Sequence, residues 1–152
     1  MNAIDYVGNN CFGAKTEVVN EEEMVPLFFI GGVDSFGVEL PCHHERAIQR
    51  LQYISKVNQF ARPYEADLAD KENWEDPLYG MKGDRVEVLH DEAFPDSVYT
   101  VHYWDSKDGN CYTALMGVTN HAHEIRPFTN EFAWNFVKKY RRLADGSIQI
   151  EE

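Results

Sequence analysis

Two loop segments of the chain carry residues that enzymes use together for proton transfer. Asp34 lies in the segment Gly31 to Ser35, and His121 lies in the segment Thr119 to His123. A loop histidine titrates near neutrality and can act as a general base. A carboxylate beside it can orient the imidazole and stabilise its charged form. The plainer interpretations are that Asp34 supports a turn and that His121 is a loop histidine with a satisfied hydrogen bond.

The histidines also allow a second interpretation, a metal site. His121 and His123 are two positions apart, and Asp34, His43 and His44 could add oxygen and nitrogen ligands of the kind that Zn²⁺ binds. The spacing matches no specific zinc motif, and we therefore expect no metal and no other cofactor. The three cysteines form no CxxC pair and predict reduced thiols, with one disulfide plus a free thiol as the alternative; they are Cys11, Cys42 and Cys111.

Composition restricts the partners of the chain. It has 152 residues, enough for one domain, and 26 acidic against 14 basic residues give a net charge of −12. Such a charge repels phosphate backbones and anionic lipids, so we expect neither nucleic-acid nor membrane partners. The first 14 residues lack the pattern of a signal peptide, which predicts a cytoplasmic protein; secretion stays open if the sequence continues upstream.

The apolar pattern predicts elements that position the two loops. Residues 1–24 form a polar lead-in, and residues 25–30 form a strand buried on both faces, as in the parallel sheet of an α/β protein. Apolar residues at helical spacing predict a helix over 43–59, followed by a long irregular segment over 60–83. The Asp34 loop then follows a strand and precedes a helix.

The second half of the chain predicts a hairpin and a closing helix. Strands are expected over 85–89, 97–104 and 111–118, and the last two are joined at the Asp108-Gly109 turn. A helix is expected over 130–142, capped by Thr129, with basic residues at its C-terminal end. After the Asp145-Gly146 turn we expect only a short tail.

The order of these elements resembles the second half of an α/β hydrolase, in which nucleophile, acid and histidine follow one another along the chain. The segment 25–41 (VPLFFIGGVDSFGVELP) resembles the acid-bearing strand and loop of esterases related to polyhydroxybutyrate depolymerases and to feruloyl and acetylxylan esterases. Asn120-His121-Ala122 resembles their Gly-His-Ala loop, and residues 127–142 resemble their closing helix.

The resemblance implies that residues 25–152 are the C-terminal part of an α/β-hydrolase sheet with flanking helices and a long covering loop. Asp34 matches the triad acid and His121 the general base, with His123 as the fallback base. The chain departs from the family at Asn120, where glycine is usual. It also has no Gly-x-Ser-x-Gly among its serines, which are Ser35, Ser55, Ser97, Ser106 and Ser147.

We therefore expect one part of a serine-type ester hydrolase, with the nucleophile outside this chain and the chain alone inactive. Its partner would be the missing N-terminal half or a second copy, and its substrate an ester, with carbohydrate-linked esters among the candidates. Three aromatic residues of the covering loop would contact substrate or close the core; they are Tyr64, Trp74 and Tyr79. The alternatives are a non-catalytic binding module and, less favoured, a histidine–metal enzyme.

Overall fold

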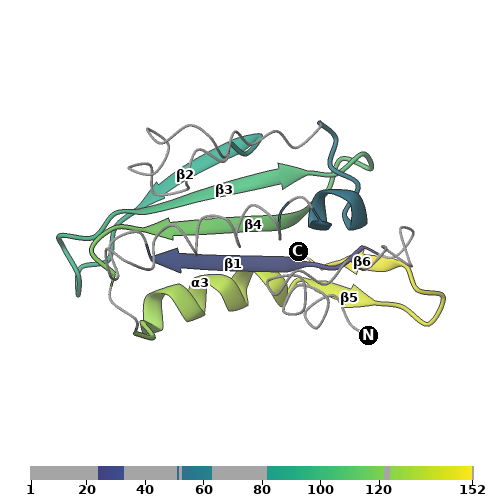
Figure 1. The fold of residues 1–152 in the computed structure, drawn as a ribbon. Helices are drawn as coiled ribbons and strands as arrows, with labels where there is room; N and C mark the ends of the chain where they lie inside the picture. Colours follow the sequence, from purple (N-terminus) through teal and green to yellow (C-terminus); the bar gives the residue numbers. More distant parts are fainter. Residues whose placement is uncertain (1–23, 33–50, 52, 63–81, 122–123, 152) are drawn as a thin grey trace, which may run out of the picture.

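The fold is built around a four-stranded mixed sheet. The computed structural model describes residues 24–32, 51, 53–62, 82–121 and 124–151. The strands lie in the order β1-β4-β3-β2 (Figure 1). Their bounds are Leu27–Gly32 for β1, Arg85–Leu89 for β2, Tyr99–Asp105 for β3 and Cys111–Val118 for β4. The structure thus has the mixed helix and strand content of the predicted α/β class.

Strand β1 pairs with β4 in parallel, whereas β3 runs antiparallel to both of its neighbours. The predicted strands 85–89 and 111–118 are found as expected, and β3 begins two residues later than predicted. Strand β1 also begins two residues later than expected, directly after Pro26, a residue that lacks the N–H needed for a ladder hydrogen bond. The pairing then continues through Gly31 and Gly32, opposite Gly117 and Val118.

The turn between β3 and β4 is set by Asp108 and Gly109, as predicted. The Asp108 carboxylate accepts hydrogen bonds from the backbone N–H of Asn110 and from the hydroxyl of Tyr112. Gly109 has a φ of 83°, in the left-handed region that glycine adopts without steric cost. The Asp-Gly step therefore closes the hairpin through the turn preference from which the hairpin was predicted.

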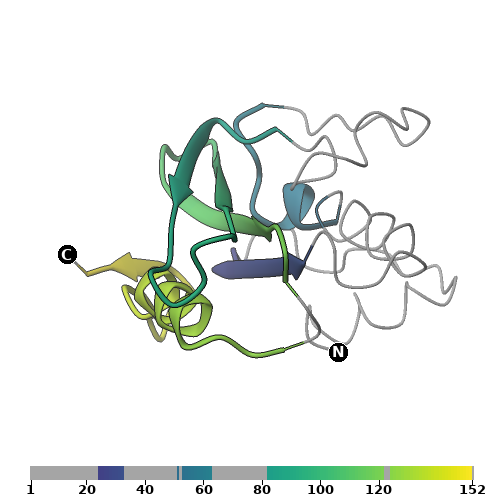
Figure 2. The same ribbon diagram turned by 90° about the vertical axis from the view of Figure 1, so that its left-hand side faces the viewer.

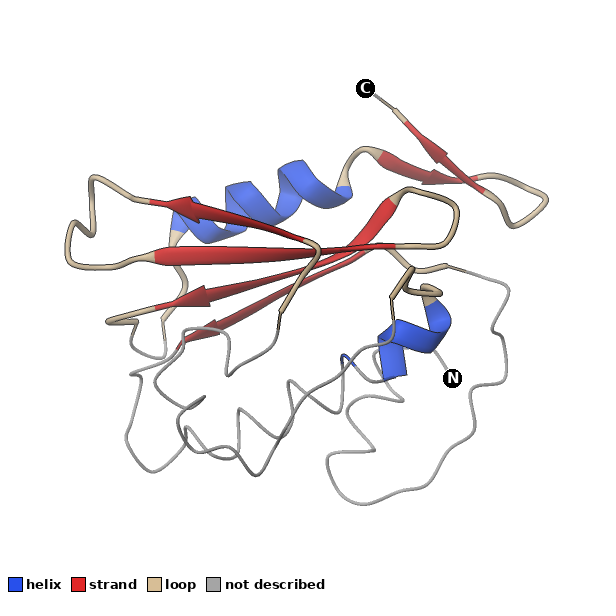
Figure 3. Ribbon diagram, turned by 90° about the horizontal axis from the view of Figure 1, so that it is seen from above, coloured by secondary structure: helices blue, strands red, loops and turns tan. Residues whose placement is uncertain are grey.

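Helical segments cover both faces of the sheet (Figure 3). Helix α3 (Pro127–Val137) packs on one face, where Phe136 joins a buried cluster with alternate residues of β3 and β4. A short helical segment, comprising Leu51 and residues 53–57, packs on the other face. Strand β4 is consequently buried along almost its whole length, and it is the strand on which both halves of the core meet. The members of the two clusters are Tyr99, Val101, Ala114, Met116, Val118 and Phe136 on the α3 face, and Leu51, Ile54, Phe60, Trp104 and Leu115 on the other.

The closing helix differs from its prediction at both ends. It spans Pro127–Val137 instead of 130–142, and residues Tyr140–Arg142 form strand β5, which pairs with β6 (Ile148–Ile150) (Figure 2, in which α3 is seen end-on). The expected tail is therefore a strand. The basic residues 141 and 142, expected at the helix end, lie in β5. The Tyr140 hydroxyl donates a hydrogen bond to the carbonyl of Cys111, which holds the chain out of helical geometry after Lys138.

The N-cap of α3 also differs from the predicted residue. Thr129 lies inside the helix, where its hydroxyl donates to the Arg126 carbonyl, and Arg126 is the N-cap. Pro127 occupies the first helical position, where its missing N–H costs nothing, and the extended backbone of Arg126 is the conformation that a following proline favours.

Residues 43–50 of the other predicted helix lie outside the described residues. The helical segment ends in a turn at Asn58 and Gln59, close to the predicted end. Most of the predicted irregular segment, residues 63–81, and the lead-in 1–23 also lie outside the described residues. Phe60, the first residue of that segment, forms a bridge to Ser106.

Asn58 joins the short helical segment to the sheet. Its side chain is fully buried and both donates to and accepts from the backbone of Val25, each at 2.7 Å. Its Nδ2 also donates to Thr113 Oγ1 of β4 at 2.8 Å. One amide thus aligns the start of β1 with β4.

Replacing Asn58 should therefore destabilise the fold. We expect Asn58→Ala to lower the free energy of unfolding by about 3 kcal/mol, because a fully buried side chain loses three hydrogen bonds at about 1 kcal/mol each. Urea denaturation followed by far-UV circular dichroism measures this change. Gln149→Ala, at an exposed position of β6, is the control and should change stability by no more than about 0.5 kcal/mol. Equal effects of the two substitutions would contradict the role given to Asn58.

Candidate functional site

The parallel pairing of β1 and β4 brings the ends of two strands to one edge of the sheet. Gly32, the last residue of β1, lies opposite Val118, the last residue of β4. The predicted base His121 follows Val118 by three positions, and the predicted acid Asp34 follows Gly32 by two. Asp34 and Ser35 themselves lie outside the described residues.

His121 is placed by a short, well-bonded loop. Thr119 continues the pairing with the residue before β3, because its N–H donates to the Val98 carbonyl and its Oγ1 accepts from the Val98 N–H. The chain turns at Asn120, and His121 is 8% exposed. The predicted base is therefore a largely buried residue on a fixed loop and not a mobile surface histidine.

The turn at Asn120 has left-handed backbone geometry, with a φ of 49°. Glycine adopts this region freely, and asparagine is among the few other residues that tolerate it. The Asn120 side chain donates to the Asp96 carbonyl at 2.7 Å. Asparagine therefore occupies a turn whose backbone geometry otherwise favours glycine.

A buried arginine holds this loop against the sheet. Arg126 is 3% exposed, and its Nη2 donates to the Asn120 carbonyl at 2.8 Å. Its Nη1 donates to Ser97 Oγ and to the Tyr99 hydroxyl, both at 2.9 Å. The Ser97 hydroxyl in turn donates to the Asn120 carbonyl. The guanidinium thus links the beginning of β3 to the residue before His121.

The charge of Arg126 is compensated on its outer side. Nε and Nη2 both lie 2.7 Å from a carboxylate oxygen of Glu124, and the guanidinium carbon lies 3.8 Å from the centre of the Phe94 ring. Burial disfavours the charged form, but the hydrogen bonds with Tyr99 and Glu124 outweigh it and raise the pKa of Arg126 above its ordinary value. Arg126 is therefore a permanent cation and a positioning residue.

Arg126 and Phe94 were not predicted from the sequence. Arg126 directly precedes Pro127, as N-cap residues often do, but nothing in the local pattern separates it from the solvated arginines of β5. Its partners come from segments up to 29 positions away, a distance over which periodicity carries no information.

A hollow of about 690 Å³ lies beside the histidine loop. Its walls include the apolar side chains of Phe94 and Pro95 and the polar residues Ser97 and Asn120. Pockets of roughly 300 to 1,000 Å³ hold small-molecule ligands. The hollow is thus large enough to receive part of a small molecule beside Asn120, the residue before His121, although His121 itself is not among its lining residues.

The remaining predicted site residues lie outside the described residues: His43, His44, Tyr64, Trp74, Tyr79 and His123. Within the described ranges, no three histidine, cysteine or acidic side chains gather closely enough to hold a metal ion. No helix in the described part of the chain is long and apolar enough to cross a membrane. Comparisons of the chain with protein-family models, with curated proteins and with solved structures gave no match.

The left-handed turn predicts which substitutions Asn120 tolerates. Asn120→Gly and Asn120→Val both remove the hydrogen bond to Asp96, but only valine is sterically strained at a positive φ. We expect the valine variant to be about 1 to 2 kcal/mol less stable than the glycine variant. Urea denaturation of the matched pair measures the difference, and equal stabilities would show that the turn does not require this geometry.

Arg126→Lys keeps the charge but loses the forked donor geometry and the stacking on Phe94. We expect the free energy of unfolding to fall by about 2 kcal/mol, and the backbone amides of Asn120 and His121 to exchange with solvent faster. Denaturation and amide hydrogen exchange measure the two effects. Arg141→Lys, on the exposed strand β5, should change neither. Unchanged exchange at His121 in the Arg126 variant would remove the positioning role.

Proposed function

We propose that this chain supplies the acid and the general base of a serine-type carboxylic-ester hydrolase, with Asp34 and His121 in these roles and the nucleophilic serine outside the chain. The observation that supports the proposal most strongly is the pairing of β1 and β4. These neighbouring strands are parallel and end in register, so both loops leave the same edge of the sheet. Catalytic groups of α/β proteins gather at such edges.

Chain length limits how far the two residues can separate. Neighbouring strands lie about 4.8 Å apart, and each residue extends the chain by at most about 3.5 Å. Asp34 is two positions beyond Gly32 and His121 three positions beyond Val118, so their Cα atoms are at most about 22 Å apart even if the loops diverge. This reach permits a carboxylate–imidazole hydrogen bond without a change in the sheet.

The proposed chemistry is acyl transfer in two steps. His121 takes the proton of the attacking serine as its oxygen adds to the ester carbonyl, and then gives that proton to the leaving alcohol. In the second step His121 takes a proton from water as the water oxygen adds to the acyl carbonyl, and then gives that proton to the serine oxygen as the acid product leaves. Asp34 holds the imidazole in position and stabilises its charged form. The buried Arg126 network fixes the loop from which His121 acts.

The hollow beside Phe94 and Pro95 is the proposed place for part of the ester. Its walls are both apolar and polar, which suits a substrate whose apolar part and whose carbohydrate or alcohol part have different surfaces. Tyr64, Trp74 and Tyr79 remain proposed covering residues, and His123 remains the fallback base.

The serine would come from an N-terminal half of the hydrolase. Strand β1 is paired with β4 and has no second neighbour among the described strands, so further strands of a sheet could add at its other edge. A second copy of the chain is the alternative occupant of this edge. The molecular mass in solution distinguishes these two occupants. It is measured for the chain alone and for a protein extended by the sequence encoded upstream.

The acid–base pair can be tested without the nucleophile. We expect ¹H NMR of the chain to show a strongly downfield imidazole N–H resonance, because a carboxylate that accepts from a histidine ring deshields that proton. The resonance should disappear in His121→Gln and in Asp34→Asn, and should persist in Asp96→Asn, which alters an acid near the same loop. Its persistence in Asp34→Asn would assign it to another carboxylate and overturn the role of Asp34.

The same preparation tests where the nucleophile lies. The chain alone should hydrolyse p-nitrophenyl acetate no faster than its histidines do in buffer, and a fluorophosphonate should not label it. Labelling would place a nucleophile inside the chain and contradict the proposed division. Loss of the downfield resonance on addition of Zn²⁺ would instead favour the histidine–metal alternative.

A further inference from the structure

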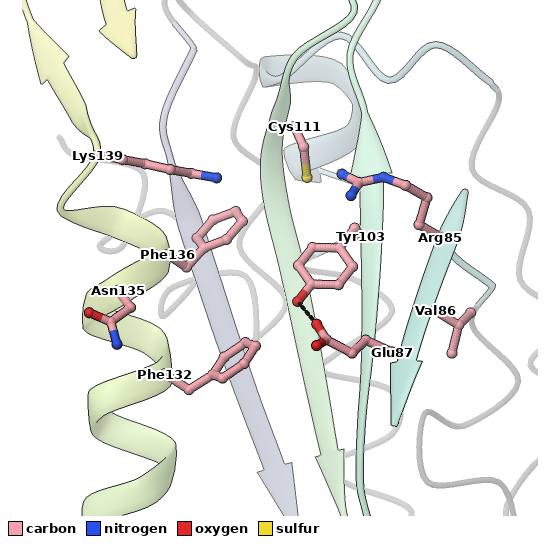
Figure 4. A pocket seen from close by; sticks show the side chains of 9 residues that line it. All are labelled: Arg85, Val86, Glu87, Tyr103, Cys111, Phe132, Asn135, Phe136 and Lys139. Carbon is pink, nitrogen blue, oxygen red and sulfur yellow. Dashed lines mark hydrogen bonds between the residues drawn. The ribbon is translucent and has the colours of Figure 1, made fainter. Parts of the chain in front are cut away.

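A second pocket lies on the α3 face of the sheet, away from the histidine loop (Figure 4). Helix α3 packs against β1, whereas β2 at the far edge is largely exposed. The step between the helix and the uncovered strands leaves a hollow of about 570 Å³, within the range of small-molecule sites. Its lining comes from α3 and the residue after its cap and from all three strands β2, β3 and β4: Arg85, Val86, Glu87, Tyr103, Cys111, Phe132, Asn135, Phe136 and Lys139.

Two cations face each other at one end of this pocket. Lys139 reaches in from the end of α3 and Arg85 from β2, with the Cys111 thiol between them (Figure 4). In the described part of the chain, no carboxylate lies within ion-pairing distance of Lys139, whose ammonium lies about 5 Å from the rings of Phe136 and Tyr140. Arg85 bonds to Asp105 through one nitrogen at 3.2 Å, so other donors of its guanidinium remain for a ligand.

The middle of the pocket is aromatic. Phe132 and Phe136 extend from α3 toward the sheet, and Tyr103 faces them from β3 (Figure 4). The ring centres of Tyr103 and Phe136 are 6.3 Å apart. This is the separation of two rings in contact, so a further flat ring would pack against the half-buried rings of Tyr103 and Phe132 and not between Tyr103 and Phe136. A small ion alone would contact only the cationic end of the pocket.

The opposite end of the pocket carries an acceptor. The Tyr103 hydroxyl donates to Glu87 at 2.7 Å. Burial and this hydrogen bond raise the pKa of Tyr103 well above its ordinary value, so the phenol stays protonated and keeps one oxygen of Glu87 occupied. The second oxygen can accept from a ligand hydroxyl. The pocket is thus positive at one end, apolar in the middle and negative at the other end.

We propose that this pocket binds a small aromatic carboxylate, with the carboxylate between Arg85 and Lys139 and the ring against Tyr103 and Phe132. A neutral aromatic molecule would form no ion pair with Arg85 or Lys139, and a free phosphate would not pack against the aromatic rings. The site is independent of the proposed ester hydrolysis. Its cationic end lies at Cys111, roughly 23 Å along β4 from the start of the histidine loop.

The proposal predicts a preference for a charged probe. We expect 2-naphthoate to bind the chain at least about fivefold more tightly than the neutral 2-naphthamide, which has the same ring. Titrations followed by ¹H–¹⁵N NMR measure both affinities. They should shift the amide resonances of Tyr103, Cys111 and Lys139, and should leave His121 unchanged. Equal affinities, or shifts confined to the histidine loop, would overturn the proposal.

A matched pair of variants tests Lys139, which has no acidic partner among the described residues. Lys139→Gln and Lys138→Gln each remove one positive charge at adjacent positions, but only Lys139 lines the pocket. The first should weaken 2-naphthoate binding about fivefold and leave 2-naphthamide binding unchanged; the second should change neither. Lys139→Arg should retain the affinity. Thermal unfolding of each variant checks that the fold is intact, and an equal loss in the Lys138 variant would show that only net charge matters.

Discussion

The buried guanidinium of Arg126 is the interaction on which the geometry of the candidate site depends. A charge that leaves water is stable only when its donors are matched, and removing one partner of such a group is costly. Arg126 meets this condition with Ser97 and Tyr99 at the start of β3, the Asn120 carbonyl on the histidine loop, and Glu124. These groups cannot move independently without leaving a buried donor unsatisfied. The position of His121 relative to the sheet is therefore set by Arg126, five residues later, together with the hydrogen bonds between Thr119 and Val98.

Strand β4 transmits this constraint to the rest of the fold. It is buried on both faces, pairs with β1 and β3, and separates the two apolar clusters. Because side chains of a strand alternate between faces, a shift of β4 by one residue would exchange the residues of the two clusters. Asn58 opposes such a shift on one face through Thr113 and Val25. On the other face, Tyr140 bonds to the carbonyl of Cys111. The register that aligns Gly32 with Val118 is thus fixed by contacts far from the site itself.

Local signals in the sequence were sufficient for the elements that depend on local chemistry. Alternation predicted β2, β-branched and aromatic residues predicted β3, and the Asp108-Gly109 turn predicted β4 as the returning strand of a hairpin. Strand pattern and turn geometry are properties of neighbouring residues. The end of α3 was wrong for the opposite reason: residues 140–142 continue a helical pattern, but Tyr140 and the pairing of β5 with β6 hold them in a strand. Asn120 could be recognised as a departure from the esterase pattern, although only its φ of 49° explains why the departure is tolerated. Arg126 escaped prediction because its role lies entirely in partners distant along the chain.

The two ends of β4 show how burial distinguishes a structural charge from one available to a ligand. At the Val118 end, the cation Arg126 is 3% exposed and its donors meet protein acceptors, so it fixes a loop and offers little to a ligand. At the Cys111 end, Lys139 lies over aromatic rings and Arg85 uses few of its donors. Burial raises the pKa of the Cys111 thiol between them, and the nearby cations offset this only in part, so the thiol stays neutral. No anion of the thiol then neutralises the two positive groups. Their charge remains directed into an aromatic-walled pocket, and an anionic ring is the chemistry that satisfies both features together.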